Sequence, residues 1–228
     1  MSINPRKKKK AANLFEEPVM VFLGKVCDML FTNIFWLICC LPVFTIGVST
    51  SAMYYVSLKM ARNDAIHSFK DFFIGFKLTF KRAALSMLFV IPLVLISYLD
   101  ISFIKGNGLG LPVYALVVFA IPVLLVLMFV SILFPLYAFY QDNIRTTIRN
   151  AFYLIVRHPL TMLLVLVINL IPIIMLFWFF ETFLEWIIVW TFLGFGLLAY
   201  INSKLLLRIF HKDLRESDYP YIEPDTLY

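Results

Sequence analysis

Charged residues are scarce in this chain, and cysteine, histidine and glycine are also few. Only 15% of the 228 residues are Asp, Glu, Lys or Arg, whereas 62% are hydrophobic and 17% are aromatic. A typical soluble domain carries about 25% charged residues and about 45–50% apolar ones. So little polar surface cannot cover so large an apolar interior, which excludes an ordinary soluble enzyme and a disordered protein.

Reactive side chains are equally scarce. Cys27, Cys39 and Cys40 lie in or beside the first apolar run, without a CxxC motif or a histidine at metal-ligand spacing. The three histidines lie far apart in the sequence, and the chain has neither an HExxH nor a G-x-S-x-G motif. We therefore expect no metal, no cofactor and no catalytic residue, and we predict that the protein is not an enzyme.

Long apolar stretches are the main feature that the chain does have. Four such runs cover residues 83–99, 111–140, 160–180 and about 183–203. A helix of about 20 apolar residues crosses the hydrocarbon core of a bilayer. All four runs are therefore predicted to span a membrane, and Pro122 and Pro135 predict a kink in the second.

Residues 26–61 permit two interpretations. One is a single span followed by a soluble helix, and the other is a hairpin of two spans, about 26–42 and 44–60. Of the 20 basic residues, 18 fall into four groups, at residues 6–10, 59–82, 145–157 and 204–215. The hairpin places all four groups on one side of the membrane, whereas a single span separates the first group from the second and breaks the positive-inside rule. The charge distribution favours the hairpin.

We thus predict an all-α, polytopic membrane helical bundle of about six transmembrane helices in the cell membrane, with both termini cytoplasmic. Its parts are a basic N-terminal segment (1–18), a transmembrane helical domain (19–210) and a flexible cytoplasmic tail (211–228). The orientation explains the net charge of +6, so the expected partner is the lipid bilayer and not nucleic acid.

An amphipathic helix is predicted on the cytoplasmic side at about residues 66–82. Its aromatic side chains recur at helical spacing, at Phe69, Phe72, Phe73, Phe76 and Phe80. Lys70, Lys77 and Lys81 form a second stripe about 100° around the helix. This pattern is typical of a helix in the membrane interface, but it equally suits a cytoplasmic helix whose aromatic stripe is packed on the spans.

Polar side chains within the spans are the candidates for function. Asn33, Thr45, Asn169 and Asn202 are predicted to form hydrogen bonds between helices. Asn169, followed by Pro172, is the best candidate for lining a cavity, and Lys25 and Asp28 are spaced to form an ion pair.

Two further sets of residues are candidate contacts. Pro42, Thr45 and Gly47 lie where the hairpin breaks, and broken helices at membrane depth often build binding sites, although a plain turn is the alternative. Arg145 and Arg149, which follow the longest apolar run, can bind a lipid phosphate or a partner protein.

Residues 41–47, 51–55 and 71–81 together resemble the YesL family of integral membrane proteins of unknown function. The resemblance is densest over residues 26–83, and Asp71 and Phe72, which lie within that stretch, are two further candidate contacts. Genes of such proteins often lie beside carbohydrate uptake systems, so the resemblance implies components of a sugar ABC transporter as partners. It implies no catalytic or binding residue.

Three functions remain open at this point. The first is a non-enzymatic accessory or interaction protein linked to carbohydrate uptake. The second is a small transporter or permease subunit with a pathway lined by the 42–47 break and Asn169. The third is an intramembrane enzyme, which would need Asp28, Asn33 and Asn169 to lie together.

Overall fold

The structure is a computed structural model that describes residues 5–106, 113–140 and 143–213. The described residues are almost entirely helical, which confirms the predicted all-α fold. The elements are α1 (Pro5–Cys39), η1 (Val43–Thr45), α2 (Ile46–Arg62), α3 (Ser68–Gly106), α4 (Val113–Phe139), α5 (Ile144–Arg157), α6 (Pro159–Trp178), α7 (Phe180–Glu185), α8 (Ile187–Val189), the π-helical turn η2 (Trp190–Gly194) and α9 (Phe195–Asp213). Most of the predicted C-terminal tail lies outside the described residues.

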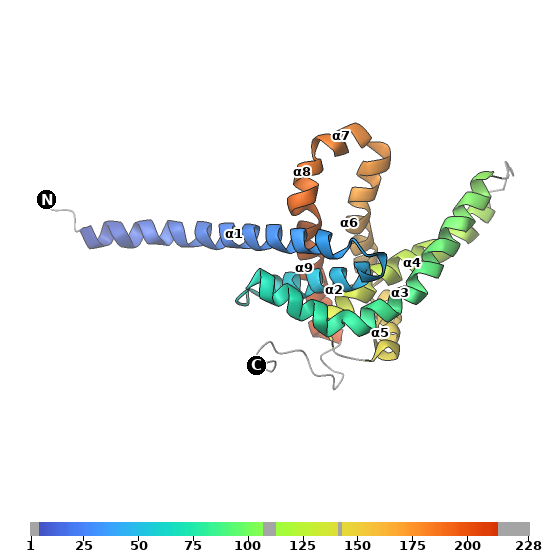
Figure 1. Cartoon of the computed structure of the whole chain (residues 1–228), viewed down its shortest axis with the longest axis horizontal. Coiled ribbons are helices and arrows are strands. Elements are labelled where there is room, and N and C mark those ends of the chain that lie inside the picture. The colour runs from blue at the N-terminus through green and yellow to red at the C-terminus, as the bar shows by residue number, and fades with distance from the viewer. Residues whose placement is uncertain (1–4, 107–112, 141–142, 214–228) are drawn as a thin grey trace.

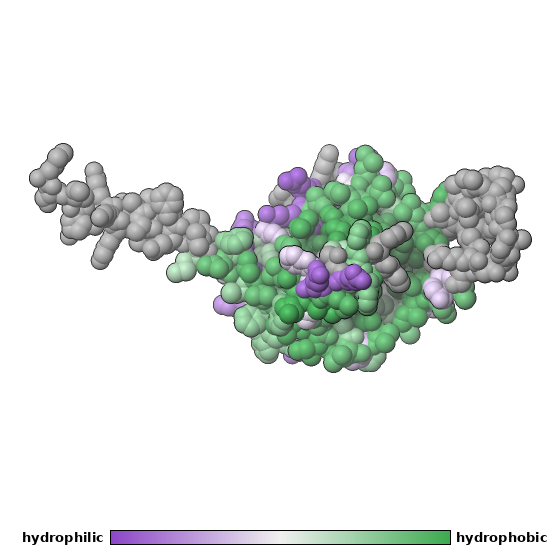
Figure 2. All heavy atoms as spheres, turned by 90° about the horizontal axis from the view of Figure 1, so that it is seen from above, coloured by the Kyte–Doolittle hydropathy of each residue, from purple (hydrophilic) through white to green (hydrophobic). Residues whose placement is uncertain are grey.

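Five segments of the described chain are long and apolar enough to cross a membrane. They are Met20–Cys39, Ser68–Ile96, Ile121–Phe139, Pro159–Leu176 and Ile187–Phe210. Their outer surfaces are largely hydrophobic, as Figure 2 shows for one face of the molecule. These helices indicate an integral membrane protein.

The sixth expected span is α2, which is not among these five segments and has a different environment. It is 17 residues long, and every residue from Gly47 to Met60 except Thr50 is buried. Its neighbours are α1, α3, α4 and α9, which pack around it. Because α2 is covered on all sides by protein, it forms the centre of the fold and not a lipid-facing wall.

Helices α1 and α2 form an antiparallel hairpin, as the favoured interpretation predicts. The Trp36 indole N–H donates to Thr50 Oγ1 at 3.2 Å near the turn. At the other end of the pair, Lys25 Nζ donates to Asn63 Oδ1 at 2.6 Å. Figure 1 shows that this pair runs crosswise to the hairpin formed by α6, α7 and α8.

Two longer hairpins extend from the region around α2. One consists of α3 and α4, and the other runs from α6 through α7 and α8 into α9 (Figure 1). The two hairpins diverge away from α2, and α5 lies beside their common base. Buried side chains of α2, α3, α4 and α9 make up most of the hydrophobic core at that base.

The predicted amphipathic helix is not a separate element. Residues 68–82 and the following span are one continuous helix, α3. Phe72 is fully buried, and its ring lies 5.8 Å from the ring of Phe35 in α1. Phe69 and Phe80, at the ends of the stripe, are exposed. The centre of the stripe is therefore core, which favours the docked helix over one lying in the membrane interface.

Pro122 and Pro135 both lie inside α4, which continues through them, so the kink stays a prediction. The last predicted span, at about 183–203, corresponds to the apolar segment Ile187–Phe210, which is divided into α8, η2 and α9. This division matters because an irregular turn exposes backbone polar groups inside an apolar helix.

Candidate functional site

A pocket of about 340 Å³ lies where the two long hairpins diverge from α2. Pockets that hold small molecules usually have volumes of about 300–1,000 Å³. Every helix that surrounds α2 contributes to its wall. The lining residues are Trp36, Ile46, Thr50, Met53, Tyr54, Met87, Val90, Val130, Ser131, Phe134, Pro135, Asn169, Pro172, Ile173, Phe195, Leu198 and Ala199.

Asn169 brings a polar group into this largely apolar wall. Its Oδ1 accepts a hydrogen bond from Asn202 Nδ2 at 2.7 Å, and the same Nδ2 lies 3.2 Å from the Tyr54 hydroxyl. Asn202 and Tyr54 are both buried, and Tyr54 also lines the pocket. Because its amide oxygen is held by a buried partner, the Asn169 side chain is fixed in the pocket wall.

Two prolines lie in the same wall. Pro135 of α4 and Pro172 of α6 both line the pocket and both lie inside their helices. A proline has no N–H, so the carbonyls of Ser131 and Ile168, one turn earlier, lack their usual backbone donor. The pairing of Asn169 with Pro172 at a cavity, expected from the sequence, is found.

Asn33 lies beside the pocket and completes the irregular turn η2. Its Nδ2 donates to the carbonyl of Thr191 at 2.8 Å and to that of Trp190 at 3.3 Å. Its Oδ1 accepts the Gly196 N–H at 3.1 Å. The buried amide of α1 thus takes over backbone hydrogen bonds that a continuous helix would make itself.

The close packing of α1 on α9 explains why glycine occurs at position 196. A Cβ atom there would lie 3.1 Å from the carbonyl oxygen of Met29. The ring of Trp36 packs on that of Phe195 with centroids 4.7 Å apart, which extends this contact to the pocket wall. Asn33, Asn169 and Asn202 all form the interhelical hydrogen bonds that the sequence predicts.

The 42–47 break contributes less to the pocket than expected. Ile46 lines it, whereas Pro42, Thr45 and Gly47 do not. Thr45 Oγ1 donates locally, to the carbonyls of Cys39 and Pro42 at 2.7 and 2.6 Å, and thereby stabilises the turn. Gly47 is helical and serves close packing, because a Cβ there would lie 2.5 Å from a ring carbon of Phe134.

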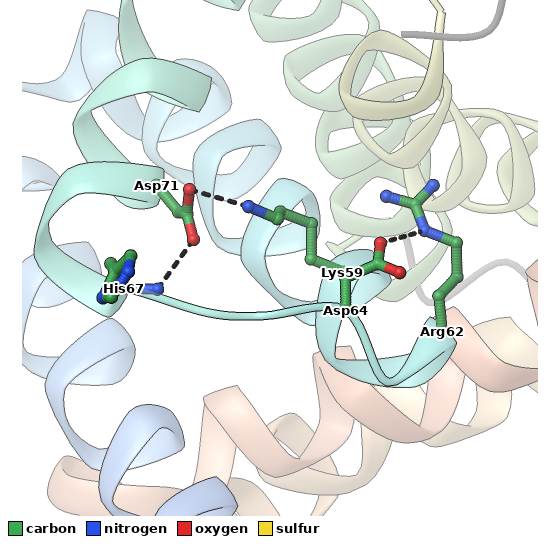
Figure 3. A network of polar contacts seen from close by, with 5 residues as sticks. All are labelled: Lys59, Arg62, Asp64, His67 and Asp71. Atoms are coloured by element: carbon green, nitrogen blue, oxygen red, sulfur yellow. Dashed lines mark hydrogen bonds and ion pairs between the residues drawn. The ribbon is translucent and has the colours of Figure 1, made fainter. Parts of the chain in front are cut away.

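Asp71 joins α3 to α2, and Phe72 packs on Phe35 of α1. Asp71 Oδ1 forms an ion pair with Lys59 Nζ at 2.8 Å, and its Oδ2 accepts the His67 N–H at 2.9 Å (Figure 3). The side chains of Lys59 and Asp71 are 8% and 3% exposed. Since Phe72 is buried as well, neither Asp71 nor Phe72 is available at the surface for a partner.

Hydrogen bonds fix the start of the short loop that follows α2. Asn63 adopts φ 62°, and its N–H and that of Asp64 bond to the carbonyls of Met60 and Lys59. This is a Schellman motif, in which a left-handed residue closes the helix end. Asp64 also pairs with Arg62 at 2.8 Å (Figure 3).

Lys25 and Asp28 do not form the ion pair that their spacing suggests. Lys25 bonds to Asn63, and a carboxylate oxygen of Asp28 accepts from the Ser68 hydroxyl. Asp28, Asn33 and Asn169 therefore have three separate sets of partners. The structure does not bring together the constellation that an intramembrane enzyme would require.

Arg145 and Arg149 lie on α5, a helix that was not among the predicted elements. Both are exposed, while the opposite face of α5 is buried through Thr147, Asn150, Ala151, Leu154 and Ile155. These buried positions recur at helical spacing, and this periodicity in the sequence could have predicted the helix.

Residues 29–101 match a family whose description is "Protein of unknown function, DUF624". The matched segment covers the last third of α1, all of α2 and most of α3. No curated protein and no solved structure matches the chain. The comparison thus connects this chain to similar proteins through the hairpin and its docked helix, without assigning an activity.

Proposed function

We propose that this chain is a non-enzymatic accessory or interaction protein of the cell membrane, with both termini cytoplasmic, that acts next to a carbohydrate uptake system. Membership of the YesL family is part of the proposal. It is supported by the match over residues 29–101, because that segment contains residues 41–47, 51–55 and 71–81, on which the resemblance rests. The proposed partner is a component of a sugar ABC transporter.

The surface around α5 is the observation that carries this proposal. Val156 and Phe152 are 81% and 56% exposed. Arg145 and Arg149 lie on the same exposed side of α5. We call these four residues the α5 surface. Large apolar side chains next to arginines are typical of protein interfaces, where they supply most of the binding energy.

Affinity purification of the full-length protein in mild detergent, from cells grown on the inducing sugar, tests this function. Mass spectrometry should recover transporter components with the wild type and lose them with a Phe152→Ser, Val156→Ser double variant. The matched control is Leu41→Ser with Phe44→Ser, because these turn residues are 81% and 58% exposed. Recovery of no transporter component with the wild type would contradict the proposal.

A small transporter or permease subunit is the second candidate, and the pocket with Asn169 favours it. Its mostly apolar wall offers few of the hydrogen bonds that a sugar needs, so this function ranks second. Uptake of radiolabelled sugar distinguishes the two. A transporter requires uptake to fall on deletion and with Asn169→Leu, and unchanged uptake after deletion would exclude it.

A further inference from the structure

Three cationic side chains meet at the ends of α2 and α9. Arg62, Lys204 and Arg208 line a surface hollow of about 420 Å³, whose remaining lining residues are Ala61 and Leu207. Lys204 and Arg208 are exposed, and Leu207 is buried beneath them. This cluster lies outside the pocket and the α5 surface. Three cations around one hollow are suited to a ligand with several negative oxygen atoms.

Two of the cations are held in place before any ligand binds. Asp64 holds the Arg62 guanidinium at 2.8 Å, and the Schellman motif fixes the backbone of Asp64. Lys204 Nζ lies 4.8 Å from the centroid of the Tyr200 ring, a cation–π contact. Asp64 pairs with one of the three cations, and none of the described residues that line the hollow is acidic.

The backbone at this end of α2 is compatible with an anion. The C-terminal carbonyls of a helix normally repel negative charge. Here the carbonyls of Lys59 and Met60 already accept the N–H groups of Asp64 and Asn63. The side-chain charges therefore dominate the local field.

The surface next to the cations indicates where the anion comes from. Leu197, Ile201, Lys204 and Arg208 are spaced by four, three and four residues on α9, and all four are exposed. They form one stripe that changes from apolar to basic near the end of the apolar segment Ile187–Phe210. A phospholipid has the same order of groups, with an acyl chain followed by a phosphate.

The geometry points to a binding site for an anionic phospholipid, with its phosphate held by Arg62, Lys204 and Arg208 and its acyl chain lying along Leu197 and Ile201. Basic pockets between membrane helices bind lipid head groups by the same combination of charge and burial. The distribution of basic residues predicts that this lipid belongs to the cytoplasmic leaflet.

Native mass spectrometry of the full-length protein, purified with phosphatidylglycerol or phosphatidylcholine, tests the site. The wild type should retain phosphatidylglycerol in preference to phosphatidylcholine. Each charge near an anionic head group is worth about fivefold in affinity, so Lys204→Gln with Arg208→Gln should bind it about 30-fold more weakly. The charge-conserving pair Lys204→Arg with Arg208→Lys should retain binding, which separates lost charge from lost folding.

The matched control removes two other exposed lysines, through Lys77→Gln with Lys81→Gln, and should leave binding unchanged. An equal loss in this control would show a non-specific attraction and overturn the site. Unchanged lipid retention in the Lys204→Gln, Arg208→Gln variant would overturn it as well. Displacement of phosphatidylglycerol by inorganic phosphate would assign the hollow to a soluble phosphate and overturn the lipid assignment.

Discussion

The Asn33 side chain and the Gly196 backbone join α1 to the start of α9: Asn33 Oδ1 accepts the Gly196 N–H at 3.1 Å. With its two donor contacts to η2, the amide of Asn33 replaces backbone pairing at an irregular turn. Water is not available in the hydrocarbon core to satisfy such groups. The discontinuity in the last span therefore depends on a residue more than 150 positions earlier in the sequence.

Replacing Asn33 with Leu should destabilise the protein, because it leaves the Gly196 N–H and the Thr191 carbonyl without their partner. We expect a loss of about 1–3 kcal/mol in the free energy of unfolding. Denaturant or thermal unfolding in detergent measures it. Thr32→Val is the control, since Thr32 is buried and its Oγ1 has no partner, so this change should be neutral or slightly stabilising. Equal stability of Asn33→Leu and the wild type would contradict the role given to Asn33.

Gly75 should tolerate no side chain. A Cβ there would lie 2.8 Å from Tyr55 Cβ, close to the backbone of α2, where the neighbour cannot rotate away. Gly75→Ala should cost about 1–3 kcal/mol through overpacking of the α2–α3 contact. Gly24→Ala is the control, because no atom lies within 4 Å of a Cβ at that position. The melting temperatures of the two variants test this prediction. Similar values would be evidence against the close contact.

Removing one partner of the buried ion pair between Lys59 and Asp71 should destabilise the protein more than replacing both partners. Asp71→Leu alone leaves an uncompensated buried ammonium group and should cost about 3–5 kcal/mol. Lys59→Met combined with Asp71→Leu should cost less than the single change, although it also removes the contact of Asp71 with His67. Unfolding of the two single variants and the double variant gives the coupling energy, which would be close to zero if the pair did not form.

Reporter fusions should locate the two ends of α2 on opposite sides of the membrane. A fusion after Gly47 is expected to be external and one after Arg62 cytoplasmic, because the hairpin brings the chain back to the side of Lys25. Alkaline phosphatase and green fluorescent protein activities measure the two locations. Cytoplasmic signals from both fusions would show that the hairpin does not cross the membrane.

The sequence was sufficient to predict the helical class, the hairpin of α1 and α2, and the cavity position of Asn169. These follow from apolar run length, charge distribution and a polar residue beside a proline. The partner of Asn33 was not predictable, because the π-helical turn exists only where α1 crosses the last span. The proximity of Arg62 and Arg208 was not predictable either, because sequence spacing carries no information on contacts between distant helices.

The central position of α2 has a consequence for biosynthesis. Tyr54 bonds to Asn202, a residue 148 positions later, so its partner does not yet exist when α2 leaves the ribosome. At about 5–20 residues per second, that interval lasts about 7–30 s. During it, the polar groups of α2 must be covered by the insertion machinery or by α1, α3 and α4, which are completed before the last helix. Completion of the last helix is therefore the step that closes the protein around α2.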